Sequence, residues 1–506
     1  MAVSSTTVGA APVAPAAGAG PRAAGGGNRA AVVTVAMALV AIGLQVLRLT
    51  RPGGLLPGNA SDTSLYLGSA IRLVHGALPY RDFVLLQPPG VVLVMSPFAL
   101  LSDLVGSRWA LGAVNLCTPL LAAANVALVG HLLRHRGWQA VLAGCGLMAV
   151  TPITYDALAN GMLEPLMDLF CLLGLALIFD GDQLAGRRRM LLGGVAFGVA
   201  GCVLVAAIVP ALVVAALAAY RQVKRLSLYA IGVAAGFAVP SIAFFSITPG
   251  IFVHDVVLAE LARAPGTHRT LAITRLQYMA FGDGPLAAIC AAAILLAVIV
   301  AGFALVRRRF TTFDVFALAG MVTMAAVQFS IATYYNHFAA MVVPFVALPL
   351  GIAVGRLAVR RPRWVAAAVA AALVLVLISV VPRFAADSGP QWQGEVDAVV
   401  PPGACGLSSP YQLMVMSDRF TSDVPGCTPM VDPFATVLAY RNDPRGLERT
   451  FQAALHHTDY LVASTTLVHA LWGSSLAPVR SYVTDHFRLV RDGPIYVYVR
   501  DGFRVG

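Results

Sequence analysis

The sequence predicts a polytopic α-helical membrane protein of about eleven transmembrane helices, followed by a small extracytoplasmic α/β domain. Two observations lead to this fold class. Of the 506 residues, 58% are hydrophobic and only 12% are charged, whereas soluble globular proteins carry about 25% charged residues. Long apolar runs also alternate with short basic clusters, and the composition turns polar after residue 381. So little charge argues against a soluble enzyme, a disordered scaffold and a disulfide-dense secreted scaffold.

The net charge of +11 would point to nucleic acid in a soluble chain. In a membrane protein the same basic residues can be loop charges that fix orientation, because cytoplasmic loops carry an excess of arginine and lysine. We therefore expect the lipid bilayer as a partner, and no nucleic acid.

The N-terminal residues 1–29 are rich in Ala, Gly, Pro and Ser, which predicts a disordered cytoplasmic tail. The apolar run 30–47 is long enough to form the first span of a transmembrane domain that extends over 30–381. A cleaved signal peptide is the alternative, and it is disfavoured because no small-residue cleavage site precedes Arg48.

Five basic clusters divide the rest of the transmembrane domain: Arg134–Arg136, Arg187–Arg189, Arg221–Arg225, Arg307–Arg309 and Arg356–Arg363. If all of them face the cytoplasm, each interval between neighbouring clusters must contain an even number of spans. The apolar runs fit this rule as three pairs: 138–157 with 163–179, 226–246 with 277–306, and 312–331 with 337–355. We expect 190–220 to form two short spans hinged near Pro210, and 364–381 to leave the cytoplasm.

One apolar run, 88–104, must not cross if the five clusters are to stay on one side. Its length, Pro97 and its close at Ser102-Asp103 predict a helix lying at the membrane interface. Residues 108–133 then cross inward. The result is eleven spans with the N-terminus inside the cell and two large outer loops, 48–107 and 247–276.

Residues 382–506 are expected to form the second domain, because their length suits a small α/β domain. Strand-like stretches occur at 459–464 and 494–500. Cys405 and Cys427 also lie in this polar part, where an oxidising compartment would allow a disulfide. The other five cysteines lie in apolar runs, and no metal-type Cys/His spacing occurs.

The first outer loop concentrates the polar side chains that could carry chemistry. Asp62 and Tyr66 fall one turn apart on a predicted helix over 62–75 and share a face. A helix N-cap and a catalytic carboxylate are equally good interpretations of Asp62. For Asp82, an ion pair with the neighbouring Arg81 is the favoured interpretation from spacing alone.

This loop resembles that of the GT-C membrane glycosyltransferases. The motif runs Asp62-x3-Tyr66, then G-x-L-P-Y-R-D-F from Gly76, then Q-P-P-G from Gln87. More narrowly, it is similar to the bacterial branch that includes protein O-mannosyltransferases and the lipid A aminoarabinose transferase. The resemblance covers residues 30 to about 355.

The resemblance implies an inverting transferase at the outer face of the cytoplasmic membrane. Such an enzyme takes a sugar from a polyprenyl-phosphate carrier and passes it to a hydroxyl of a glycolipid, a cell-wall glycan or a protein. Mannose and arabinofuranose carriers both remain open. By the same resemblance Asp62 is the first choice for the general base and Asp82 the second.

Further roles follow by position in the family pattern. Tyr66, Arg81, Gln87 and Glu164 are placed in the active site, and Tyr335 with His337 near the carrier phosphate. Arg263, Arg269 and Arg275 of the second outer loop are phosphate-binding candidates, since guanidinium groups suit phosphate. Each has a plainer alternative: a helix-start carboxylate for Glu164, an interfacial aromatic belt for 334–337, and a headgroup-binding loop for the arginines.

The sequence departs from the family at Gln87, where the aminoarabinose branch has an acidic residue. A metal site there is therefore doubtful. No cofactor is assigned, and a divalent cation remains open.

Two other functions compete with the transferase. The first is a transporter or flippase of a lipid-linked glycan, but the expected spans hold few ionisable residues and the chain shows no internal repeat. The second is a non-catalytic envelope-assembly protein whose outer domain binds partners.

Overall fold

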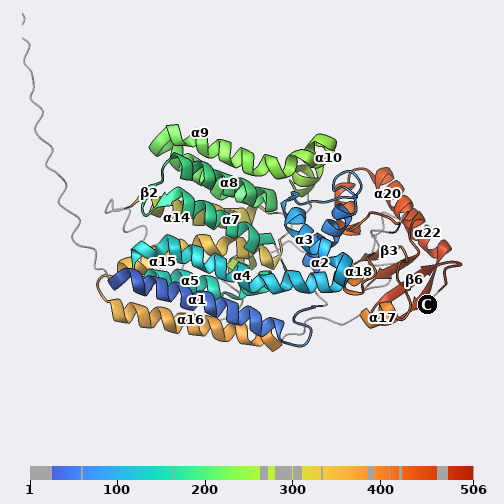
Figure 1. Cartoon of the computed structure of the whole chain (residues 1–506), viewed down its shortest axis with the longest axis horizontal. Coiled ribbons are helices and arrows are strands. Elements are labelled where there is room, and N and C mark those ends of the chain that lie inside the picture. Colours follow the sequence, from blue (N-terminus) through green and yellow to red (C-terminus); the bar gives the residue numbers. More distant parts are fainter. Residues whose placement is uncertain are drawn as a thin grey trace, which may run out of the picture.

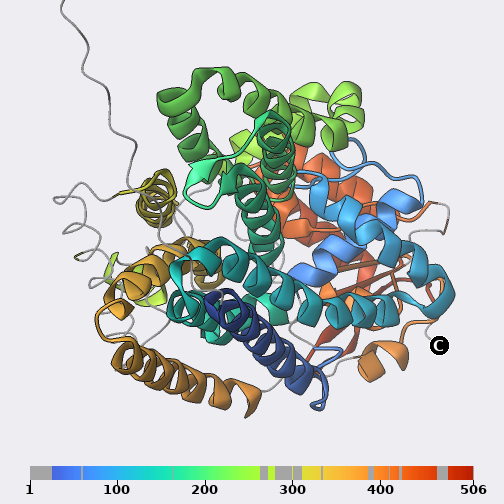
Figure 2. The ribbon, with the colours of Figure 1, turned by 60° about the vertical axis from the view of Figure 1, so that its left-hand side comes forward.

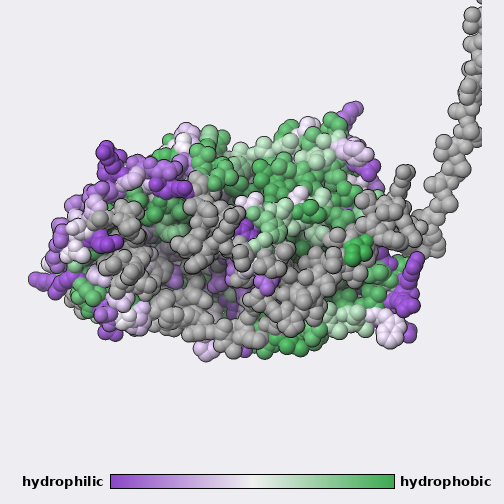
Figure 3. Space-filling view, turned by 180° about the vertical axis from the view of Figure 1, so that it is seen from behind, coloured by the Kyte–Doolittle hydropathy of each residue, from purple (hydrophilic) through white to green (hydrophobic). Residues whose placement is uncertain are grey.

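The computed structural model describes residues 25–57, 61–161, 163–261, 272–279, 310–331, 334–385, 393–409, 411–420, 426–463 and 477–504, together with 299 and 424. Its long helices run side by side in one bundle, and the C-terminal part lies at one end of that bundle (Figure 1). A hydrophobic surface covers the coloured part of the bundle in Figure 3, with hydrophilic residues toward both ends. This arrangement is that of a multi-pass membrane protein.

Five helices in the described residues are long and apolar enough to cross a membrane: Gly27–Leu49, Ser107–Arg136, Val205–Ile247, Thr312–Ser330 and Asn336–Ala358. A sixth span results if α5 (Trp138–Val150) and α6 (Pro152–Ala159), bent by 45°, count as one. Three more bundle helices are α7 (Leu163–Ile178), α8 (Arg187–Val203) and α16 (Pro362–Ala385). The count of eleven stays a prediction, and most of 277–306 lies outside the described residues.

The chain between the second and third basic clusters breaks a few residues before the expected hinge. Helix α8 ends at Val203, and α9 (Ile208–Ile247) follows after a short break. Pro210 therefore lies in the first turn of α9, where proline is tolerated. A second break occurs inside α9 at Gln222, whose φ of −157° is not helical, so the chain turns within the third basic cluster.

Close backbone contact joins α8 to the second arm of α9. Both helices carry glycines four residues apart, Gly194 with Gly198 and Gly232 with Gly236. A Cβ on Gly198 would lie 2.2 Å from the carbonyl oxygen of Val233, and one on Gly236 would lie 2.2 Å from that of Val195. Small residues at this spacing let helices approach closely in lipid. Packing of these glycines therefore fixes the distance between the two helices.

The first outer loop folds as two helices at the end of the bundle. These are α2 (Ser61–Val74) and α3 (Gly90–Val105), the latter covering the run 88–104. At 16 residues, α3 is shorter than the roughly 20 residues that a span requires. A Cβ on Gly90 would lie 2.5 Å from the carbonyl oxygen of Cys202, so α3 starts in close contact with α8.

The C-terminal part contains a four-stranded sheet with the order β3-β4-β6-β5. Strand β3 (Gly406–Ser409) pairs in parallel with β4 (Tyr460–Ala463), while β6 (Tyr496–Arg500) pairs antiparallel with both β4 and β5 (Phe487–Arg491). The strand-like stretches expected at 459–464 and 494–500 contain β4 and β6. Cys405, directly before β3, forms a disulfide with Cys427, with their Cα atoms 5.1 Å apart.

Among the described residues of the C-terminal part, five helices accompany the sheet: α17 (Gln393–Asp397), α18 (Gln412–Met416), α19 (Pro433–Ala439), α20 (Pro444–His456) and α22 (Ala477–His486). Phe451 and Leu455 of α20 pack with Leu461 of β4 and Val483 of α22 in a separate core. Helices and strands together thus form an α/β unit with its own hydrophobic core.

This C-terminal unit docks on the first outer loop and on α4 (Ser107–Leu133). Asp418 Oδ1 accepts hydrogen bonds from the Arg108 backbone N–H (2.8 Å) and the Ser107 hydroxyl (3.2 Å). The Ser107 hydroxyl also lies 2.8 Å from the carbonyl oxygen of Val415. Asp418 therefore satisfies donors in the first turn of α4 that have no partner within the helix. Figure 2 shows the outer-loop helices lying against the C-terminal unit.

Four of the five basic clusters converge at the opposite end of the bundle, around the hairpin of β1 (Phe179–Asp180) and β2 (Gln183–Leu184) (Figure 1). Arg189 donates to the carbonyl oxygens of Leu177 and Phe179, and Arg225 donates to those of Leu184 and Ala185. The cluster Arg307–Arg309 lies outside the described residues. Basic clusters and the C-terminal unit are thus separated by the length of the bundle.

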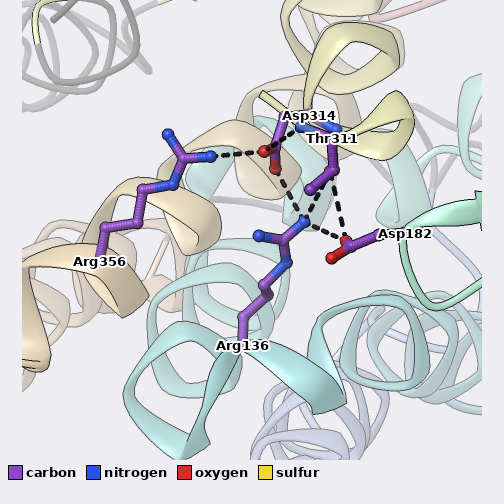
Figure 4. Close-up of polar contacts among 5 residues, drawn as sticks. All are labelled: Arg136, Asp182, Thr311, Asp314 and Arg356. Carbon is purple, nitrogen blue, oxygen red and sulfur yellow. Dashed lines mark hydrogen bonds and ion pairs between the residues drawn. The ribbon is translucent and has the colours of Figure 1, made fainter. Parts of the chain in front are cut away.

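A buried carboxylate holds this basic end together (Figure 4). Asp314, at the start of α14 (Thr312–Ser330), is 1% exposed and lies between two guanidinium groups. Arg136 approaches it to 2.9 Å and also pairs with Asp182, while Arg356 of α15 (Val343–Ala358) pairs with its second oxygen. Thr311 and Asp314 complete a capping box. Ion pairs centred on Asp314 and Arg136 therefore join four segments that are distant in sequence.

Substituting Gly198→Ala should destabilise the folded protein by about 1–3 kcal/mol, because the added methyl group forces α8 and α9 apart. Gly201→Ala is the matched control: its Cβ would be 3.7 Å from the Phe237 side chain, an ordinary contact. Thermal unfolding of both variants in detergent measures the difference. Equal melting temperatures would refute the role of close packing here.

Substituting Asp314→Asn should lower the free energy of unfolding by about 1–3 kcal/mol, since it leaves the half-buried guanidinium groups of Arg136 and Arg356 without their shared counter-charge. Asp182 is 42% exposed, so Asp182→Asn should cost less than about 1 kcal/mol. Chemical denaturation in detergent compares the two. A cost for Asp182→Asn as large as for Asp314→Asn would contradict this account.

Candidate active site

Asp62 lies in the first turn of α2 and is half-buried. Its carboxylate is hydrogen-bonded to Tyr411, the residue just before α18 in the C-terminal unit. Burial, and after it the nearby Asp432 and Asp62, raise the pKa of Tyr411 well above its usual value. The phenol is therefore protonated at neutral pH and donates its hydrogen to Asp62.

Glu164 lies in the first turn of α7 and is only 2% exposed. Its Oε1 is 3.8 Å from Nε2 of His337, and its Oε2 has no hydrogen-bond partner among the described residues. The carboxylates of Glu164 and Asp62 are close enough to interact electrostatically. Asp168, one turn deeper in α7, is buried as well.

Tyr335 and His337 enter the same region from the start of η4 (Asn336–Val342). Their rings stack with centroids 5.6 Å apart and an interplanar angle of 9°, and Phe338 packs edge-on against both. Tyr335 also interacts electrostatically with Tyr411. The structure therefore brings together Asp62, Glu164, Tyr335, His337 and Tyr411, which we call the carboxylate–tyrosine cluster.

The first turns of two helices face this cluster. Asp62 belongs to the first turn of α2 and Glu164 to that of α7. Backbone N–H groups at a helix start are unpaired and carry partial positive charge. The two helix starts therefore favour the carboxylates that they carry.

Asp82 lies elsewhere, and the structure shows it as an ion pair. Its carboxylate accepts from Arg81 at 2.9 and 2.7 Å and from the Leu78 backbone N–H at 2.7 Å. These contacts, the Arg81 bond first, lower the pKa of Asp82. Arg81 and Asp82 line a separate cleft of about 770 Å³, so the two expected base candidates occupy different sites.

Tyr66 and Gln87, the remaining predicted residues of this loop, have structural contacts. Tyr66 is 4% exposed and packs in the main core one turn after Asp62. Tyr80 has a φ of +67° and donates its phenol to the carbonyl oxygen of Gln87 at 2.7 Å. Gln87 is half-buried. This bond holds the loop between α2 and α3 in its bent path.

Of the three phosphate-binding candidates, Arg263 and Arg269 lie outside the described residues. Arg275, on α12 (Ala272–Met279), is 5% exposed and donates to the carbonyl oxygens of Gln328 and Ile331, both at 2.7 Å. Its guanidinium lies 5.0 Å from the ring centroid of Tyr334. It therefore supports the segment that leads into Tyr335 and His337.

No group of three or more His, Cys, Asp or Glu side chains could hold a metal ion in the described part of the chain.

Comparison with known proteins adds a family and a fold. Residues 86–333 match the model of glycosyltransferase family 87. ArnT from Cupriavidus metallidurans, solved bound to undecaprenyl phosphate, is similar with a TM-score of 0.60 over 92% of this chain and 97% of that chain, at 15% identity. The chain shares its fold with this structure.

A second similar structure is the archaeal oligosaccharyltransferase AglB from Archaeoglobus fulgidus, in complex with an inhibitory peptide and a dolichol-phosphate. Its TM-score is 0.56, with 13% identity over 86% of this chain and 69% of that chain. No curated protein matches the sequence significantly. At such identities the likeness concerns the fold, while the family match supports a glycosyltransferase. The resemblance expected from the outer-loop motifs is therefore confirmed.

Tyr411 is not among the site residues that the sequence predicted. Nothing near Tyr411 in the sequence marks it, because its partner Asp62 belongs to the first outer loop. Only the docking of the C-terminal unit brings the two together.

Substituting Tyr411→Phe should lower kcat/KM for sugar transfer by about tenfold to a hundredfold, since a hydrogen bond to a charged group contributes about 1.5–3 kcal/mol. The acidic limb of the pH–rate profile should move to higher pH, because the carboxylate form of Asp62 loses a donor. Tyr482→Phe, which removes a phenol near His456 in the same unit, is the matched control. An unchanged pH profile in Tyr411→Phe would separate this tyrosine from the base.

Proposed function

We propose that the protein transfers a sugar from a polyprenyl-phosphate carrier to a hydroxyl of a glycan, glycolipid or protein acceptor at the outer face of the cytoplasmic membrane. The carboxylate–tyrosine cluster carries this proposal. It places a half-buried carboxylate, a tyrosine donor and a histidine at the end of the bundle where the C-terminal unit docks. ArnT was solved with undecaprenyl phosphate and AglB with dolichol-phosphate, and we infer a donor of the same chemical class here.

Asp62 is the base in this mechanism. The acceptor oxygen attacks the anomeric carbon, the bond from that carbon to the phosphate oxygen breaks, and the acceptor proton passes to Asp62. A single displacement inverts the anomeric centre. Tyr411 orients the Asp62 carboxylate through its hydrogen bond. Asp82 is a weaker candidate, because its oxygens already accept three hydrogen bonds.

The leaving polyprenyl phosphate gains negative charge as the bond breaks, and fixed donors stabilise it. His337 and Tyr335 are the candidates within the cluster. Arg275 packs over the ring of Tyr334, the residue that precedes them. Arg263 and Arg269 remain candidates by sequence. Glu164, with one oxygen lacking a partner among the described residues, is placed to hold the sugar or its acceptor by hydrogen bonds.

Sidedness follows from the charge distribution. Four basic clusters meet at one end of the bundle, and the carboxylate–tyrosine cluster lies toward the other end. Arginine-rich loops stay in the cytoplasm, so we place the N-terminus inside the cell and the C-terminal unit outside. A Cys405–Cys427 disulfide suits that oxidising side.

Substituting Asp62→Asn should abolish transfer while the protein still inserts and folds, because the amide cannot accept the proton. Purified protein would be incubated with labelled polyprenyl-phosphate mannose and polyprenyl-phosphate arabinofuranose, and release of polyprenyl phosphate measured. Asp103→Asn, an exposed aspartate of the same loop that pairs with His75, should keep full activity.

Three results would contradict this proposal. Full activity in Asp62→Asn would remove Asp62 from the role of base. Loss of activity in Asp82→Asn alone would transfer that role to Asp82. Scrambling of the lipid across vesicles without cleavage would favour a flippase instead.

A further inference from the structure

A cleft of about 770 Å³ opens between the first outer loop, the segment after α9 and the C-terminal unit. Its walls include Arg81 and Asp82 on one side and Tyr440, Arg449 and Thr450 on the other. The five residues of the carboxylate–tyrosine cluster do not line it. The cleft is therefore a site distinct from the proposed transfer site, in a size range typical of small-ligand pockets.

Asp255, which lines this cleft, has a buried carboxylate. It lies in η3 (His254–Leu258), a π-helical turn, which is a rare geometry that occurs often at functional sites. Oδ1 lies 2.9 Å from Nδ1 of His254, while Oδ2 has no hydrogen-bond partner among the described residues. The residue is 2% exposed. A buried carboxylate oxygen without a partner is costly unless a ligand supplies a donor.

The charges of the cleft are nearly balanced. Arg81 is paired with Asp82, and the opposite wall carries both Arg449 and Asp443, which caps α20 by accepting from the Gly446 backbone N–H. Such a lining lacks the excess of positive charge that a phosphate or another anion requires. It suits a neutral ligand that brings its own hydroxyl donors.

Much of the remaining lining is apolar or aromatic, with Thr428, Thr436 and His457 as further polar side chains. Val84 and Ile251 contribute on one side, and Met430, Ala453 and the Tyr440 ring on the other. Sugar rings present C–H faces to apolar and aromatic groups and hydroxyls to carboxylates. The combination of an orphan carboxylate oxygen, a tyrosine and apolar walls therefore matches a polyhydroxylated ligand.

We propose that this cleft binds a neutral oligosaccharide stretch of the acceptor, away from the hydroxyl that receives the sugar, with Asp255 Oδ2 accepting a hydrogen bond from a sugar hydroxyl. That this oligosaccharide belongs to the acceptor rests on the proposed function, whereas the binding of an oligosaccharide to the cleft does not. Such a subsite lets binding energy from a remote part of the substrate position the reacting hydroxyl.

The test is direct binding of α-mannotetraose and α-arabinofuranotetraose to the full-length protein in detergent, by saturation-transfer NMR and calorimetry. At least one should bind. Asp255→Asn should weaken it by about tenfold or more, because a hydrogen bond to a charged acceptor is lost. Ala453→Trp fills the cleft from an exposed helix position, so it should abolish binding without disturbing the fold.

Two controls keep the outcome interpretable. Asp492→Asn, an exposed aspartate outside the cleft, should leave binding unchanged. Asp62→Asn should also bind the oligosaccharide fully, because Asp62 does not line the cleft. Unaltered protein that binds the oligosaccharide but does not transfer sugar would refute the proposed function alone. Failure of both tetrasaccharides to bind, undiminished binding in Ala453→Trp, or displacement of the sugar by inorganic phosphate would overturn the subsite.

Discussion

Docking of the C-terminal unit on the membrane bundle is the constraint on which the site depends. Asp418 accepts from Ser107 and Arg108 at the start of α4, and Tyr411 donates to Asp62 at the start of α2. The first contact satisfies donors at a helix start, while the second gives a donor to a carboxylate that lies at a helix start. Because Asp418 and Tyr411 flank the short helix α18, one rigid element sets the position of the tyrosine relative to the base.

The opposite end of the bundle solves a different electrostatic problem. There the arginines of the basic clusters donate hydrogen bonds to carbonyl oxygens at helix ends and in the hairpin, and they form ion pairs with one buried carboxylate, Asp314. Carbonyls at helix ends carry partial negative charge and accept such donors well. The arginines that we propose to orient the chain in the membrane therefore also tie its connectors together. Orientation and stability of that end have a common physical origin.

Much of the fold could be predicted because its causes are local. Apolar length, basic clusters and strand patterns are properties of short segments, and they predicted α1, α4, α14, β4 and β6. The separation of Asp62 from Asp82 could not be predicted in this way. Both lie in one loop, but the bend at Tyr80, with its left-handed φ of +67° and its bond to Gln87, directs Asp82 into the cleft. Tyr411 and Asp255 depend in the same way on contacts between distant segments.

The two sites also differ in what they can discriminate. In the proposed mechanism the carboxylate–tyrosine cluster handles groups common to many sugar transfers, namely a hydroxyl proton and a leaving phosphate, so it would offer little selectivity among acceptors. Selectivity requires contacts that a wrong acceptor leaves unsatisfied. Asp255, a buried carboxylate with an oxygen that lacks a partner in the described part of the chain, is such a contact, because an acceptor without a hydroxyl at that position leaves the oxygen desolvated. Chemistry and recognition are thereby assigned to separate surfaces joined by the same docking contact.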